Sequence, residues 1–143
     1  MSIKIQPRSQ PDVRLILARA DILPTRQRLH IGEIMFARPQ HLSADQVLDL
    51  AHRRGHRISK ATVYNTLRLF CRKGILREVL VDPSRIFFDS NTDDHHHLYN
   101  EDTGLLTDIP AGCLRPDAFG ALPAGTELVG VDVIVRIRGS RRG

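Results

Sequence analysis

The sequence predicts an α+β protein with an N-terminal winged helix-turn-helix domain, residues 1–90, followed by a small α/β dimerisation domain, residues 91–143. Two helical patterns between residues 43 and 74 are separated by a short glycine-containing turn. Two β-rich runs follow directly, as in a wing. Residues 1–90 hold 16 Lys and Arg against 8 Asp and Glu, whereas residues 91–143 hold 5 against 8. The first part therefore has the charge of a polyanion-binding domain.

Two helices are expected before the helix-turn-helix. Residues Pro11–Ile22 place Val13, Ile16 and Leu17 on one face, which predicts an amphipathic helix. Thr25 can cap a second helix that runs to about Ala37. Its apolar residues are spread too widely for one stripe, so we expect it to be central and contacted on two sides.

Local signals mark both helices of the helix-turn-helix. A capping box, Ser43–Gln46, opens the helix Ala44–Arg53, and the turn Gly55-His56-Arg57 separates it from the next helix. Ser59 can cap that second helix, and Gly74 can end it by adopting positive φ.

The second helix of the motif has one packing face and one polar, basic face. Val63, Leu67 and Phe70 share the packing face. The other face mixes tyrosine, asparagine and arginine, which can contact base edges and phosphates in a major groove. The residues expected to contact DNA are Arg57, Lys60, Thr62, Tyr64, Asn65, Arg68 and Arg72. The alternative is a solvated, arginine-rich helix face.

The wing is expected from Ile75–Val81 and Arg85–Asp89, which flank a turn-forming Asp-Pro-Ser. Beyond it, His95–Tyr99 and Leu105–Ile109 predict a hairpin, and residues Pro110–Gly125 leave room for only a short helix.

The last element expected is a strand, Thr126–Arg138, one face of which is wholly apolar. Roughly fifty residues without a disulfide are near the lower limit for an independent core. Pairing with a second copy would bury this face, so we expect a homodimer. The two-fold symmetry of such a dimer requires an inverted repeat in double-stranded DNA, which we expect to be AT-rich.

Three consecutive histidines suggest a ligand site. In a strand, His95 and His97 point to the same face about 7 Å apart, while His96 points to the other. Two imidazoles so placed can share one metal ion, although they can also be merely structural. His30 and His56, like His52, are expected on helix surfaces or in turns.

The two cysteines, Cys71 and Cys113, have no CxxC neighbour and are expected in the core. No apolar run approaches the roughly 20 residues of a membrane span, and Met1–Pro11 lacks the apolar segment of a signal peptide. We expect a cytoplasmic protein with no membrane partner.

Four stretches together resemble the ferric uptake regulator family. They are Leu23–Arg28, Leu42–Asp45, Ile58–Leu67 and His95–His97, and the absence of a CxxC after the histidines resembles the iron response regulator branch. The resemblance implies a dimeric winged-helix repressor of iron and haem metabolism genes. It also implies an interdomain metal site formed by His41, Asp89, His95, His97 and Asp108.

The resemblance also bears on cofactors. Three imidazoles and two carboxylates suit Fe²⁺ or Mn²⁺, and Zn²⁺ in vitro. Asn100 and Thr103 stand where the family often has a cysteine pair, so we expect no structural CxxC zinc. The branch responds to haem, and without a Cys-Pro motif a haem b would take nitrogen ligands from His95, His96 and His97.

Two other functional classes fit parts of the sequence. One is a winged-helix DNA-binding protein without ligand control. The other is a metal-dependent hydrolase, for which such a site is chemically admissible. The sequence offers the hydrolase no recognisable general base, so we expect a transcription regulator and not an enzyme.

Overall fold

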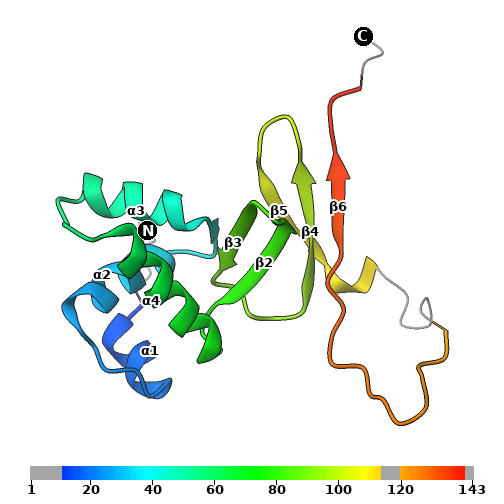
Figure 1. Cartoon of the computed structure of the whole chain (residues 1–143), viewed down its shortest axis with the longest axis horizontal. Coiled ribbons are helices and arrows are strands. Elements are labelled where there is room, and N and C mark those ends of the chain that lie inside the picture. The colour runs from blue at the N-terminus through cyan, green and yellow to red at the C-terminus, as the bar shows by residue number, and fades with distance from the viewer. Residues whose placement is uncertain (1–10, 114–119, 141–143) are drawn as a thin grey trace, which may run out of the picture. The chain divides into compact units, whose positions relative to one another are not determined.

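The computed structural model describes residues 11–113 and 120–140, and the chain divides into two compact units between Thr92 and Asp93 (Figure 1). The first unit comprises α1 (Val13–Arg19), α2 (Arg26–Met35), β1 (His41–Leu42), α3 (Ala44–Arg53), α4 (Lys60–Arg72), β2 (Arg77–Asp82) and β3 (Arg85–Asp89). The second comprises β4 (His95–Asn100), β5 (Leu106–Pro110), the 3₁₀ turn η1 (Ala111–Cys113) and β6 (Ile134–Ile137). The α+β class is confirmed. No helix among the described residues is long and apolar enough to cross a membrane.

The helices of the first unit begin where local chemistry fixes them. The side chains of Asp12, Thr25, Ser43 and Ser59 each accept a hydrogen bond from a backbone N–H in the first turn of the helix that follows. The expected capping box of α3 is present in full. Gly74 has φ 77°, which ends α4 as predicted.

Helix α2 is central, as expected from its widely spread apolar residues. Ile31, Ile34 and Met35 are buried, and α2 contacts α1, α3 and α4. Val63, Leu67 and Phe70 of α4 are fully buried in the same core. The core therefore fixes α4 against the other helices and leaves its opposite face outward.

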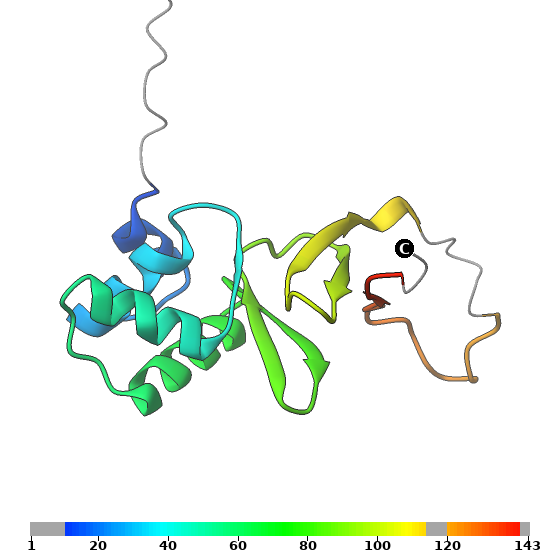
Figure 2. The same cartoon turned by 90° about the horizontal axis from the view of Figure 1, so that it is seen from above.

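The wing is a three-stranded sheet in the order β1-β3-β2. Figure 2 shows the β2–β3 hairpin projecting from the helices. The pairing of β1 with β3 was not predicted, because a two-residue strand has too little sequence for any periodicity to appear. The pairing sets His41 opposite Asp89.

The second unit is a three-stranded sheet in the order β5-β4-β6, and its predicted hairpin is confirmed. Asn100 closes the hairpin turn by accepting hydrogen bonds from the backbone N–H groups of Asp102 and Thr103. Of the short helix expected in Pro110–Gly125, the described part is η1, and residues 114–119 lie outside the described residues.

The long C-terminal strand predicted for Thr126–Arg138 was wrong in extent. Only Ile134–Ile137 is a strand, and it pairs in parallel with β4 (Figure 1). A strand must bond its backbone groups to a neighbour, and the register gives β6 partners only from His97 to Asn100. Of the alternating apolar side chains, Val129, Val135 and Ile137 are exposed, whereas Val131 and Val133 are partly buried.

One close contact in the first unit predicts a sign change in stability. A Cβ added at Gly32 of α2 would lie 2.5 Å from Cγ1 of Val13 on α1. The overpacking cost of Gly32→Ala, about 1–3 kcal/mol, should outweigh the helix-propensity gain of about 1 kcal/mol. In a Val13→Ala background the same substitution should instead stabilise, as measured by urea unfolding. Equal effects in both backgrounds would contradict this packing. Gly130→Ala, where an added Cβ meets nothing within 4 Å, is the control.

Candidate metal centre and DNA-reading helix

Strand register in the first unit sets a histidine against an aspartate. His41 of β1 lies directly opposite Asp89 at the end of β3. Nε2 of His41 is 3.1 Å from Oδ2 of Asp89, and the two side chains are 13% and 1% exposed. The other carboxylate oxygen accepts a hydrogen bond from the backbone N–H of Asn91 at 2.9 Å. The pair is thus held in a buried position where β1 begins and β3 ends.

The second unit repeats this arrangement. His97 of β4 lies directly opposite Asp108 of β5. Oδ1 of Asp108 is 3.6 Å from Nε2 of His97 and 3.2 Å from Nε2 of His95. The two imidazole centroids are 4.5 Å apart, which confirms that His95 and His97 share a face. Both imidazoles are buried, whereas Asp108 is 42% exposed.

The hydrogen bonding of His95 decides which of its ring nitrogens faces Asp108. Nδ1 of His95 is hydrogen-bonded to the carbonyl oxygen of Asp93, which can only accept, so Nδ1 donates. A neutral imidazole has one N–H, so Nε2 of His95 then faces the carboxylate oxygen of Asp108 with a lone pair. A cation between the two groups, either a proton or a metal ion, satisfies both. A histidine whose outer nitrogen donates to a carbonyl is the usual orientation of a metal ligand.

His96 lies on the other face of β4. Its side chain is buried, and its Nδ1 has no hydrogen-bond partner among the described residues. Of the three consecutive histidines it is therefore the one whose polar atom is unsatisfied. It does not share the face on which His95 and His97 meet Asp108.

The outward face of α4 holds most of the residues expected to contact DNA. Arg57, Lys60, Asn65, Arg68 and Arg72 are exposed. Thr62 and Tyr64 are only partly so. The hydroxyl of Thr62 accepts a hydrogen bond from the capping Ser59, and the ring of Tyr64 packs edge-on against Phe88 at 6.4 Å.

Two of the basic residues are held by neighbours. Arg68 donates from its guanidinium to the hydroxyl of Tyr64 at 2.9 Å, and it lies 4.8 Å above that ring's centroid. Nζ of Lys60 lies 3.0 Å from a carboxylate oxygen of Asp45 on α3. Arg68 is therefore oriented by its own helix, while Lys60 has an anionic neighbour that a phosphate would have to replace.

Cys71 is only partly buried, less than the core position expected for it, and the side chain of Cys113 lies outside the described residues. Burial, reinforced by the charge of Glu78, raises the pKa of the Cys71 thiol to about 11. The thiol is protonated at neutral pH, and a thiol is a poor metal ligand. The candidate donors are accordingly imidazoles and carboxylates.

The sequence predicted the histidines and aspartates of the candidate site, but it did not predict the strand pairing and the side-chain contacts around them. No sequence signal marks β1, although His41 depends on it. The Tyr64–Arg68 contact could have been predicted from the sequence, because residues four apart on a helix are neighbours.

Comparisons with known proteins place the chain in a family. The profile of the ferric uptake regulator family matches residues 20–114. The peroxide-responsive repressor PerR of Staphylococcus epidermidis is 34% identical over 93 residues, which are 65% of this chain and 62% of that protein. The chain thus spans about three fifths of the length of the curated relatives it matches.

Solved structures show the same fold at low identity. A structure of the ferric uptake regulator from Pseudomonas aeruginosa with manganese has a TM-score of 0.71 at 23% identity, covering 92% of this chain and 100% of that one. The ferric uptake regulator of Vibrio cholerae has a TM-score of 0.73 at 24% identity, covering 90% and 100%.

Proposed function

Because this chain belongs to the ferric uptake regulator family, we propose that it is a dimeric DNA-binding regulator, mainly a repressor, controlled by a divalent metal. Members of the family regulate transcription and are not enzymes, which sets the hydrolase aside. The family expected from the sequence is confirmed. The iron response regulator branch remains part of the proposal, as do iron and haem metabolism genes as targets.

The observation that carries the metal proposal is the presence of a histidine–aspartate pair on each side of the unit boundary. Asp89 ends β3 and His95 begins β4, with only residues 90–94 between them. Six residue steps span at most about 21 Å. One cation taking ligands from both pairs would use His41, Asp89, His95, His97 and Asp108. Such a set suits Fe²⁺ or Mn²⁺, and also Zn²⁺.

A metal bound in this way would act by setting the orientation of the first unit relative to the second. The second unit carries the dimer contact in this proposal, and the first carries α4. One ion shared by both units fixes the angle between the two reading helices of the dimer, so occupancy selects the arrangement that fits successive major grooves. The ion needs no chemistry beyond coordination.

The second unit supports the dimer. Among its described residues only two hydrophobic side chains, Tyr99 and Leu106, belong to the buried core. Edge strand β6 exposes Val135 and Ile137, and Val129 is almost fully exposed. A second copy would cover this surface.

Haem is the second candidate signal, and His96 is the observation that favours it. Its buried imidazole has an unsatisfied nitrogen among the described residues, and imidazole is a good axial ligand. Haem held by His95, His96 or His97 would have to part the strands that bury them. It would therefore compete with the metal and select a state that does not read DNA.

The first prediction separates base contacts from phosphate contacts. Arg68→Ala should weaken binding to an AT-rich inverted repeat by about 1–3 kcal/mol and affect random DNA less, because Arg68 reads a base. Lys60→Ala should weaken all DNA equally and reduce the salt slope by about one unit. Fluorescence anisotropy across a salt series measures both. Arg53→Ala, an exposed arginine of α3 outside the reading face, is the control. Equal losses of Arg68→Ala on both DNAs would assign Arg68 to a phosphate.

The second prediction tests the metal. His95→Ala should lower the metal content of the natively purified protein, as measured by elemental analysis, and alter operator affinity and the small-angle scattering profile together. His52→Ala, a histidine outside both pairs, should change none of the three. Loss of metal with unchanged affinity and shape would leave a winged-helix protein without ligand control.

The third prediction tests haem. Titration should give the Soret band of histidine-ligated haem and reduce operator affinity, and replacing His95, His96 and His97 together by alanine should abolish both effects. A His96→Ala variant isolates the imidazole that lies on the opposite face. An unchanged Soret band in the triple variant would rule out these ligands, and full operator affinity with haem bound would rule out the switch.

A further inference from the structure

The first unit contains a second cluster of metal-ligating side chains, which shares no residue with the centre described above. His30 and Glu33 lie on α2, and His56 lies in the turn between α3 and α4. Their ligand atoms all lie within 4.8 Å of one another. We propose that these three residues form a separate, exchangeable site for a transition-metal dication, with Zn²⁺ as the ion that suits it best.

The cluster brings an unsatisfied imidazole nitrogen close to a carboxylate. Nδ1 of His30 is buried and has no hydrogen-bond partner among the described residues. It lies 3.9 Å from a carboxylate oxygen of Glu33, too far for a hydrogen bond and far enough for an ion to lie between them. The unsatisfied nitrogen and the carboxylate both gain from a cation. Water or another small ligand would complete the tetrahedron that Zn²⁺ prefers.

Binding requires the two imidazoles to separate. The rings of His30 and His56 are stacked, with centroids 3.5 Å apart and planes 18° from parallel. A metal lies in the plane of each ring it binds, so two parallel rings cannot both direct a lone pair at one ion. Rotation about χ2, which is soft for histidine, tilts them toward a shared ion. Glu33 is 54% exposed and can follow.

Charge around the cluster restricts the choice of ion. A hollow of about 280 Å³ beside it is lined by His30 and His56, and also by Arg26 and Arg57. The cluster offers one carboxylate, and two guanidinium groups lie near it. A hard ion such as Mg²⁺, which depends on oxygen ligands and negative charge, would therefore gain too little binding free energy. Zn²⁺ gains more because imidazole is among its preferred ligands.

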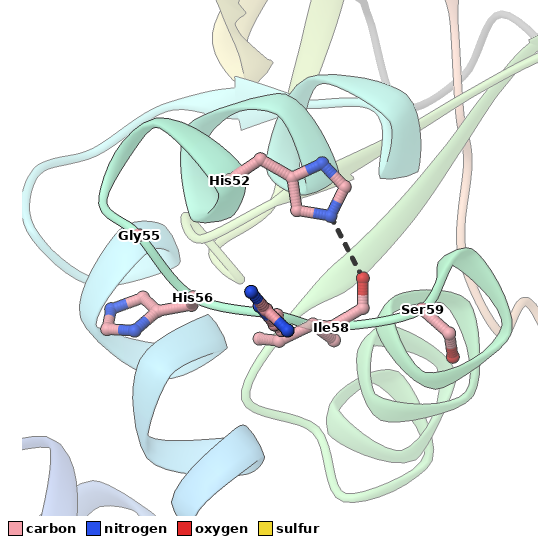
Figure 3. Close-up of a pocket in the computed structure, with 6 residues that line it drawn as sticks. His52, Gly55, His56, Ile58 and Ser59 are labelled. Carbon is pink, nitrogen blue, oxygen red and sulfur yellow. Dashed lines mark hydrogen bonds between the residues drawn. The ribbon is translucent and has the colours of Figure 1, made fainter.

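The position of the cluster gives it a link to DNA reading. His56 stands three residues before Ser59, whose side chain caps α4. Figure 3 shows the ring of His56 directed away from that of His52, which is bonded through Nε2 to the carbonyl oxygen of Ile58 at 3.0 Å. An ion on His56 would join α2 to the turn that sets the start of the recognition helix. His52 would take no part.

The test is a Zn²⁺ titration of the full-length protein, followed by long-range ¹H–¹⁵N correlation of the imidazole nitrogens. That measurement reports His30 and His56 separately from the histidines of the second unit. We expect nitrogen shifts typical of zinc coordination at both rings. Glu33→Gln, a surface substitution, should weaken zinc binding at this site by more than the roughly 10–100-fold that loss of a supporting group costs. His56→Gln should abolish it.

His52→Gln is the matched control, since His52 lines a separate hollow together with His56 and should leave the zinc response of His30 unchanged. Unshifted resonances of His30 and His56 at saturating Zn²⁺ would overturn the proposal, as would zinc affinity unaffected by Glu33→Gln. Because the nitrogens of His95 and His97 are read in the same spectra, failure here is distinguishable from failure of the interdomain centre.

Discussion

The candidate site depends on antiparallel strand register. In both units a histidine lies directly opposite an aspartate on the neighbouring strand, His41 against Asp89 and His97 against Asp108. Side chains alternate between faces along a strand, so a slip of one residue would turn either partner to the other face. Each unit must therefore fold in one register before it can offer ligands. In the first unit the helical core secures that register, because buried Phe88 precedes Asp89 and belongs to that core.

The two units are unequal in what they bury. The first has a continuous core from Leu17 to Phe88, whereas the described part of the second adds only two buried hydrophobic side chains. Three histidines are buried in the second unit, and moving polar imidazoles out of water costs free energy, most of all at His96, whose Nδ1 has no hydrogen-bond partner among the described residues. In the proposed function a cation and a second copy of the chain offset that cost, so stability and sensing depend on the same groups. Metal binding would then contribute folding energy as well as a signal.

Sequence predicted what is decided locally. The capping residues Thr25, Ser43 and Ser59 and the stop at Gly74 depend on groups within a few positions, and all four are as expected. The predictions that failed concern pairing between segments that are distant in sequence. Strand β1 exists because β3 lies beside it, and β6 is short because β4 offers so few partners. The stack of His30 on His56 likewise joins α2 to a turn more than twenty residues away, and nothing in either segment alone indicates it. Spacing did place His95 and His97 on one face, because alternation along a strand is itself local.

Strand β3 gives the first unit a physical connection between the proposed metal ligand Asp89 and helix α4. Asp89 ends this strand, and the preceding Phe88 contacts Tyr64 of α4 edge-on, with planes 85° apart. Tyr64 in turn holds Arg68 through its hydroxyl and its ring. Register pairs Phe88 with Leu42, so the strand that carries His41 also positions Phe88. An ion that holds His41 to Asp89 therefore restrains the backbone on both sides of Phe88, and that restraint reaches the tyrosine that orients Arg68. In the proposed function, this arrangement would let a metal act on α4 from within the first unit alone.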